Sequence, residues 1–197
     1  MIERLPDSYA KSVLSGMAGA VQSMQDERSP GLHVSTIIRS IMETLEPKRF
    51  ASQGDDGPPV EWTSAGTIWE FLLEAAMTKL AMGSSLIRPG EVEKDGIIST
   101  PDAISIGDWI VHEFKFTWMS SNGAIEHKKF YHWILQVKAY CHMLGSNHAR
   151  IHGFFVMGDY RGSGPQPLAW DLKFTSLELN ETWSMLVNHA KQKGWLE

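Results

Sequence analysis

The side chains best suited to chemistry in this sequence are Asp102, Glu113 and Lys115. Residues 109–116 alternate apolar and polar side chains, which predicts a β-strand. Because successive strand side chains point to opposite faces, Glu113 and Lys115 stand side by side on one face. A turn at Gly107 folds Asp102, which lies on or just before the preceding strand, back beside them. The sequence therefore predicts two carboxylates and one ammonium group in one place.

This combination suits the hydrolysis of phosphodiesters. Two carboxylates can hold a hard divalent cation such as Mg²⁺. The cation lowers the pKa of a bound water and neutralises charge that develops on the phosphate oxygens. A neighbouring lysine can orient the water or offset negative charge in the transition state. A Glu-x-Lys pair alone is more often a surface ion pair on a strand, so the aspartate upstream gives the pattern its weight.

Pro101-Asp102 followed by Glu113-Phe114-Lys115 resembles the core motif of the PD-(D/E)XK nuclease superfamily. The turn 99–102 is similar to the corresponding turn in phage-recombination exonucleases of the lambda-exonuclease kind and in RecB-like nuclease domains. The resemblance implies that Asp102 and Glu113 hold one or two Mg²⁺ or Mn²⁺ ions. It also implies that the backbone carbonyl of Phe114 is a further ligand and that Lys115 positions the attacking water.

A third carboxylate comes from the segment upstream. Thr63 or Ser64 caps a predicted helix that runs to about residue 82, and Glu70 lies at the edge of its apolar face, one turn after Gly66. By pattern alone this is an ordinary amphipathic helix with two surface glutamates, of which Glu74 lies further toward solvent. The Gly-x-x-x-Glu spacing is similar to the helix that precedes the catalytic strands in lambda-exonuclease-like nucleases. That resemblance makes Glu70 a metal ligand.

A second helix is predicted at about residues 127–144, after the strand that carries Glu-x-Lys. Lys129, His132, Gln136 and Tyr140 line one arc of it. The expected core stripe beside them consists of Phe130, Ile134, Val137, Cys141 and Leu144. An amide and a phenol four residues apart present adjacent donors toward a phosphate or a carboxylate. Gln136-x-x-x-Tyr140 resembles the motif that RecB-like nucleases carry on this helix, which implies contact with the nucleic-acid backbone. Lys129 and His132 join these two as predicted substrate-binding residues.

Composition places limits on the function. Hydrophobic residues make up 43% and charged residues 21% of the 197 residues, which is ordinary for a globular protein. The single cysteine, Cys141, excludes an iron–sulfur cluster held by four cysteines. No apolar run reaches signal-peptide or membrane-span length, so we expect a cytoplasmic protein without membrane contact. The net charge is −5, but residues 113–150 are predominantly basic, as expected of an enzyme that binds phosphates along one groove.

The order of elements predicts an α/β fold, with a mixed central β-sheet flanked by helices and a restriction-endonuclease-like core. Two helices are predicted in the N-terminal part, at about 6–27 and from about residue 35 to before Pro47. The apolar face of the second carries Ile37, Ile38, Ile41, Met42 and Leu45. Later come a strand at about 86–94, broken at Pro89-Gly90, two strands within 96–115, strands at 150–157 and 168–174, and a helix at 176–195. We expect one domain over residues 1–197, made of N-terminal helices and a loop (1–62), a catalytic core (63–157) and a C-terminal hairpin strand and helix (158–197).

Together these features predict a divalent-metal-dependent deoxyribonuclease. The resemblance favours an exonuclease of phage-type recombination or repair. A restriction-type or structure-specific endonuclease using the same residues is the first alternative. The second is a catalytically silent module of this fold that binds nucleic acid or protein. The sequence leaves open the polarity of digestion, the preference for single or double strands or for RNA, and the oligomeric state, a homo-oligomer included.

Overall fold

The computed structural model describes residues 29–50, 66–69, 86–123, 125–162 and 164–197 of the chain. The predicted helix at 6–27, the loop at 51–62 and most of the predicted helix at 63–82 lie outside these residues. Of that last helix, residues 66–69 are described and are helical.

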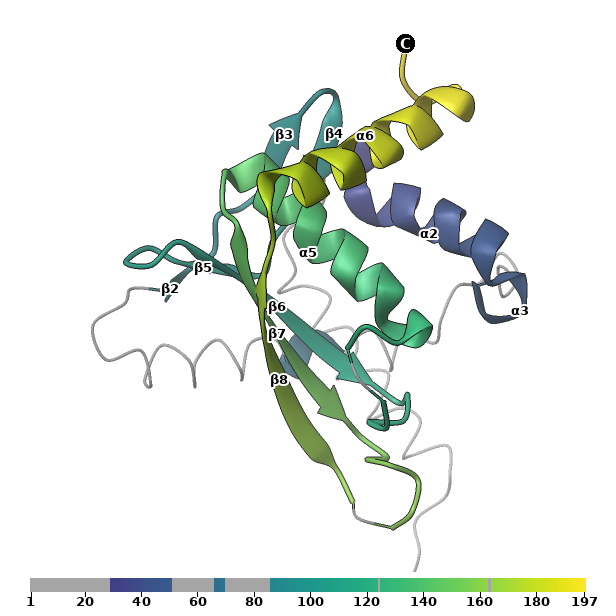
Figure 1. The fold of residues 1–197 in the computed structure, drawn as a ribbon, viewed down its shortest axis with the longest axis vertical. Helices are drawn as coiled ribbons and strands as arrows, with labels where there is room; N and C mark the ends of the chain where they lie inside the picture. The colour runs from purple at the N-terminus through teal and green to yellow at the C-terminus, as the bar shows by residue number, and fades with distance from the viewer. Residues whose placement is uncertain (1–28, 51–65, 70–85, 124, 163) are drawn as a thin grey trace, which may run out of the picture.

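Three long helices lie on one face of a β-sheet (Figure 1). They are α2 (Val34–Leu45), α5 (Tyr131–Leu144) and α6 (Ser176–Gln192), with the single turn α3 (Pro47–Phe50) after α2 and the 3₁₀ turn η1 (Lys128–Phe130) before α5. The start of α6 is fixed by a capping box, in which Thr175 and Glu178 each bond the other's backbone N–H. Within the described ranges, no helix is both long and apolar enough to cross a bilayer.

The main sheet has five strands in the order β2-β5-β6-β7-β8. They are β2 (Leu86–Ile87), β5 (Ala103–Ser105), β6 (Ile110–Thr117), β7 (His148–Phe155) and β8 (Gln166–Lys173). Only the β6–β7 pair is parallel, and α5 forms the crossover between these two strands. The predicted mixed sheet flanked by helices is therefore confirmed.

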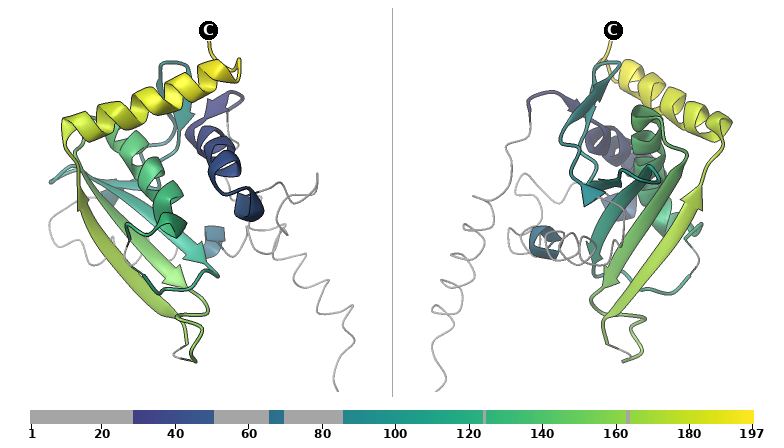
Figure 2. Two further views of the ribbon diagram at one scale, coloured as in Figure 1. Left: turned by 45° about the vertical axis from the view of Figure 1, so that its right-hand side comes forward. Right: turned by 90° about the vertical axis from the view of Figure 1, so that its left-hand side faces the viewer.

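A smaller sheet carries β1 (Leu32–His33), β4 (Ile97–Ser99) and β3 (Val92–Lys94) in that order. Asp95 and Gly96 form the tight β3–β4 turn, and both have positive φ (53° and 73°). The side chain of Asp95 accepts a 2.8 Å hydrogen bond from the indole N–H of Trp183 on α6. This contact fixes the small sheet beside the helices, above the main sheet in Figures 1 and 2.

Helix α5 is buried on two sides, between the main sheet and the pair α2 and α6 (Figure 2). Its predicted core residues Phe130, Val137 and Cys141 are fully buried. Trp133 and Leu135, which are not on the predicted stripe, are also buried. A helix covered on both sides has no single apolar face, and this explains why periodicity identified only part of its core.

Residues 86–94 are interrupted at Pro89-Gly90, as expected, and Gly90 (φ 72°) sends β2 and β3 into different sheets. Two predictions about individual elements are wrong. The stretch 96–115 holds three strands rather than two. Leu45, predicted on the apolar face of α2, is 59% exposed, because it lies in the last turn of the helix at the edge of a surface cavity.

Candidate active site

The β5–β6 hairpin brings two carboxylates together. Ala103 pairs with His112, so Asp102, which immediately precedes β5, lies across from Glu113. The backbone N–H of Phe114 donates a 2.6 Å hydrogen bond to Oδ2 of Asp102, and the two carboxyl groups are close enough to share a hydrogen bond. Glu113 is 1% exposed. The antiparallel register thus places both acidic groups on the sheet face that α5 covers.

Lys115 connects this carboxylate pair to α5. Its ammonium group forms an ion pair with Oε1 of Glu113 and donates a 2.9 Å hydrogen bond to Oε1 of Gln136. The amide of Gln136 in turn donates a 2.7 Å hydrogen bond to the hydroxyl of Tyr140, which is 4% exposed. Five predicted site residues therefore form one continuous polar chain from the sheet to the helix. Residues three and four apart on α5 share a face, which lets Gln136 and Tyr140 meet.

Burial dominates the electrostatics of this cluster. It raises the pKa of Asp102, while the charges of Lys115 and Arg88 and the Phe114 N–H act in the opposite direction. Arg88 follows β2, the strand that pairs with β5, and no motif in the sequence marks it as part of the site. A buried pair of carboxylates held by a lysine is incompletely neutralised, so additional positive charge stabilises the ionised pair.

The two other predicted substrate-binding residues are arranged differently. The amine of Lys129 donates to the backbone carbonyls of Ser120 (2.7 Å) and Asn122, which ties it to the loop after β6 and not to the carboxylates. His132 packs its ring edge-on against Phe50, with ring centroids 5.3 Å apart. Burial, followed by nearby positive charge, lowers the pKa of His132 to about 3, so this ring is neutral at physiological pH.

Glu70, the predicted third metal ligand, lies outside the described residues, as does Glu74. The preceding residue, Trp69, is described, and its ring lies 4.1 Å from that of Phe154 and 6.1 Å from that of Phe116. Both of these rings belong to the sheet face opposite α5. The turn that leads into Glu70 therefore packs against the end of β6 that follows Lys115.

The donor set fits a divalent cation. In the described parts of the chain, no group of three His, Cys, Asp or Glu residues could hold a metal ion. Asp102 and Glu113 still supply adjacent carboxylate oxygens, which are the ligands that Mg²⁺ and Mn²⁺ prefer. A cation beside them would oppose the effect of burial on the pKa of Asp102. The Phe114 carbonyl remains a predicted ligand.

A second polar group, not recognised as a site in the sequence, lies on the opposite face of the sheet. His112 bonds Ser105 (2.7 Å) and His152 (3.1 Å), and the two imidazole rings stack with centroids 5.3 Å apart. Burial lowers the pKa of both histidines to about 4. The strand alternation places His112 on the face away from Glu113, so this group is separate from the carboxylate cluster.

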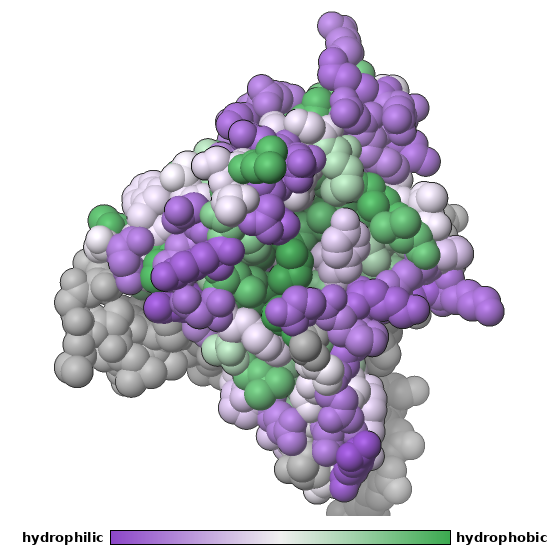
Figure 3. All heavy atoms as spheres, viewed as in Figure 1, coloured by the Kyte–Doolittle hydropathy of each residue, from purple (hydrophilic) through white to green (hydrophobic). Residues whose placement is uncertain are grey.

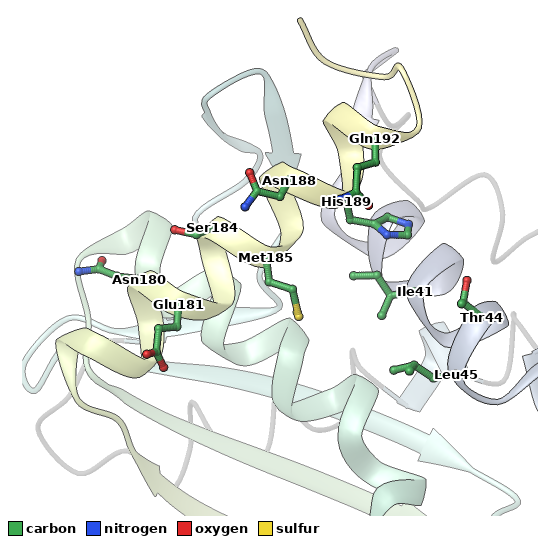
Figure 4. Close-up of a pocket in the computed structure, with 10 residues that line it drawn as sticks. All are labelled: Ile41, Thr44, Leu45, Asn180, Glu181, Ser184, Met185, Asn188, His189 and Gln192. Carbon is green, nitrogen blue, oxygen red and sulfur yellow. The ribbon is translucent and has the colours of Figure 1, made fainter.

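A surface cavity lies apart from both groups. It has a volume of about 720 Å³ and lies between α2 and α6, lined by Ile41, Leu45, Met185 and His189 among others (Figure 4). Hydrophobic residues gather between these two helices on the face shown in Figure 3. This cavity has no cluster of carboxylates or basic residues and therefore does not extend the candidate site.

Comparisons with known proteins place the fold. No protein-family model and no curated protein sequence matches the chain. A solved structure of a phage-related exonuclease from Haemophilus somnus 129PT is 14% identical, has a TM-score of 0.54, and covers 80% of this chain and 79% of its own. An alkaline exonuclease from Laribacter hongkongensis is also 14% identical, with a TM-score of 0.51 over 82% of this chain and 87% of its own. The same exonuclease in complex with dAMP is 15% identical over the same shares, also with a TM-score of 0.51. These matches show that the chain shares the fold of these exonucleases.

Proposed function

We propose that this chain is a divalent-metal-dependent deoxyribonuclease that hydrolyses phosphodiester bonds in DNA and acts in the cytoplasm. The observation that carries the proposal is the Asp102–Glu113–Lys115 cluster at the β5–β6 hairpin of an exonuclease-like fold, in which Glu113 is buried and the other two are half-buried. A buried ion pair of this kind contributes little to stability compared with apolar residues of the same volume. Its presence is better explained by chemistry than by folding.

Each residue of the cluster has a distinct role in the proposed mechanism. Asp102 and Glu113, with Glu70, would hold one or two Mg²⁺ or Mn²⁺ ions, which supply Lewis-acid stabilisation of the charge that develops on the phosphate. The ammonium group of Lys115 orients the attacking water and offsets negative charge near it. The Phe114 N–H holds the Asp102 carboxyl in place by its hydrogen bond.

Gln136 and Tyr140 keep Lys115 in position. The amide oxygen of Gln136 accepts from the lysine, and its amide nitrogen donates to the tyrosine, so the side chain cannot flip without losing both bonds. A fixed ammonium group needs no rearrangement during the reaction, and such preorganisation is the main source of electrostatic catalysis. Their contact with the DNA backbone, which the resemblance implies, is a further part of the proposal.

The test is cleavage of linear and circular DNA with Mg²⁺ or Mn²⁺, with and without chelator. We expect metal-dependent degradation of linear DNA only, which indicates an exonuclease; its role in phage-type recombination or repair is proposed from the resemblance. Nicking of circles indicates the restriction-type or structure-specific endonuclease. Binding of DNA without cleavage under either metal contradicts the proposal and identifies a binding module.

Variants assign the activity to the cluster. Asp102→Ala and Lys115→Ala should each abolish cleavage and leave the circular dichroism spectrum unchanged. Lys138→Ala is the matched control, because Lys138 lies on the same helix as Gln136 but pairs with Glu178 on α6, 3.6 Å away. Glu70→Ala should abolish cleavage and Glu74→Ala should have a mild effect. The opposite result would move the third ligand to Glu74.

A further inference from the structure

Two loops continue the sheet directly beyond the candidate site. β6 ends two residues after Lys115, and β7, its parallel neighbour, ends level with it. We call the segments that follow these strands, residues 118–123 and 156–162, the rim. The rim lies at the end of the main sheet opposite the C-terminus of the chain (Figure 1).

Hydrogen bonds join the two segments of the rim into one unit. The N–H of Ser121 donates to the carbonyl of Gly158 at 2.8 Å, and the hydroxyl of Tyr160 donates to the carbonyl of Trp118. The backbone of Tyr160 is held in the left-handed region (φ 63°), a conformation that is unfavourable for a tyrosine. The surrounding bonds therefore hold this aromatic side chain in a defined place.

The rim exposes apolar side chains that folding leaves at the surface. Tyr160 is 59% exposed, Met157 50% and Trp118 37%. The Trp118 ring contacts Phe116 edge-on at 5.1 Å, and Phe116 stacks on Phe154 at 5.8 Å between centroids. An aromatic series thus runs from β6 and β7 to the surface. Rigid aromatic rings lose little conformational entropy when they bind a partner.

The charges around the rim favour a polyanion. Lys128 and Lys129 of η1 and Arg161 of the rim outnumber Glu126 and Asp159, although the whole chain has a net charge of −5. Lys129 bonds the carbonyl of Ser120, so one of these cations sits directly on the rim. Flat apolar faces beside positive charge match the bases and phosphates of a single nucleic-acid strand.

We propose that the rim is a stacking platform for unpaired nucleobases of the substrate DNA strand at the end of the sheet that follows Lys115, with Trp118 and Tyr160 providing the aromatic faces. This rests on the proposed function, because the DNA strand is the substrate of that site. The platform makes single-stranded DNA, or the frayed end of a duplex, the form that the protein binds first. Stacking tolerates any base, so the proposal predicts no sequence preference.

The test is fluorescence anisotropy with a labelled oligothymidylate, using the full chain in the presence of EDTA so that nothing is cleaved. Stacking is worth about 1–3 kcal/mol per base, so Trp118→Ala and Tyr160→Ala should each weaken binding about 5- to 150-fold. Trp118→Phe should recover most of the affinity and Trp118→Leu should not. An oligonucleotide with the same phosphates but abasic sugars should bind the wild type as weakly as thymidylate binds the alanine variants.

Trp195→Ala is the matched control, because Trp195 is 40% exposed at the opposite end of the molecule. It should bind oligothymidylate like the wild type. Two results of this assay would overturn the platform: alanine variants that bind oligothymidylate within twofold of the wild type, or wild-type protein that binds abasic and thymidylate DNA equally well. Rim variants that keep their DNA affinity but lose binding to a protein partner would also overturn it. A cleavage assay with Mg²⁺ or Mn²⁺ distinguishes the failure of this proposal from the failure of the proposed function. If the rim variants still cleave DNA, the nuclease proposal stands whatever the binding result. If the wild type does not cleave DNA, the nuclease proposal itself is refuted.

Discussion

Replacing Lys115 by methionine tests how strongly the carboxylate pair depends on the charge of its ammonium partner. The substitution keeps the length of the side chain and removes its charge, while Glu113 stays almost completely buried. Breaking a buried ion pair by removing one partner is unfavourable by about 3–5 kcal/mol. Protonation of the buried carboxylate removes its charge and so reduces the loss of stability. The free energy needed to protonate it depends on pH, and this sets an upper bound on the loss.

The size of that limit follows from the pKa of an ordinary glutamate. One pH unit corresponds to about 1.4 kcal/mol per proton, and pH 7.5 is about three units above the usual glutamate pKa. We therefore expect Lys115→Met to lower the free energy of unfolding by about 4 kcal/mol at pH 7.5 and by less than about 2 kcal/mol at pH 5.5. The folded variant holds more protons than its unfolded chain, so its stability falls as the pH rises.

Urea unfolding between pH 5.5 and 8 measures this difference, without divalent cations. Lys138→Met is the control, because the two lysine side chains are similarly covered (18% exposed for Lys138, 21% for Lys115) but Lys138 pairs with a half-exposed glutamate. Its effect should be small and constant over this range. A Lys115→Met protein that loses less than about 1 kcal/mol at pH 7.5, or the same amount at every pH, would refute the view that Lys115 neutralises buried carboxylates.

Three further predictions concern neighbouring residues. Gln136→Leu removes the acceptor of the Lys115 ammonium, so kcat should fall about 10- to 100-fold with KM nearly unchanged in a steady-state cleavage assay; a change confined to KM would mean that Gln136 contacts only DNA. His152 and its neighbour His112 have pKa values of about 4, so the folded protein loses stability as the pH falls from about 6.5 to 4. In His152→Phe that loss should be smaller by about 3 kcal/mol in pH-dependent urea unfolding, and parallel curves would contradict it. Gly153→Ala brings a methyl group within 2.9 Å of an aromatic carbon in the core, so the protein should be less stable by about 1–3 kcal/mol in thermal unfolding; an unchanged midpoint would show that the rings move aside.

The arrangement of the carboxylates follows from local rules that the sequence displays. The alternation of β6 places Glu113 and Lys115 on one face, and the turn after β5 sets the register that brings Asp102 across from Glu113. Strand period and hairpin register act over a few residues, so one sequence suffices to predict them. The roles of these residues as metal ligands stay predictions.

The contacts that the sequence did not predict depend on elements far apart along the chain. Arg88 acts on Asp102 because β2 is added to the edge of the sheet beside β5, and Arg88 lies at the end of that short strand. The hydrogen bond of Lys129 to the loop after β6 depends on the position of η1 beside that loop. Neither contact follows from a periodic pattern or a fixed spacing of residues, so the sequence alone does not indicate it.

In helix α5, local sequence pattern and contacts with distant elements together determine the geometry of the site. Its face toward the sheet carries Gln136, which has to be polar to meet Lys115, while Leu135 and Val137 on either side of it are buried. A glutamine in a largely apolar helix is unfavourable unless its amide is satisfied on both sides, and here Lys115 and Tyr140 satisfy it. The polar chain therefore fixes the rotation of α5 against the sheet as well as the position of the lysine. Replacing Gln136 alone should lower the proposed nuclease activity before it disturbs the fold, because the apolar core of α5 remains on both sides.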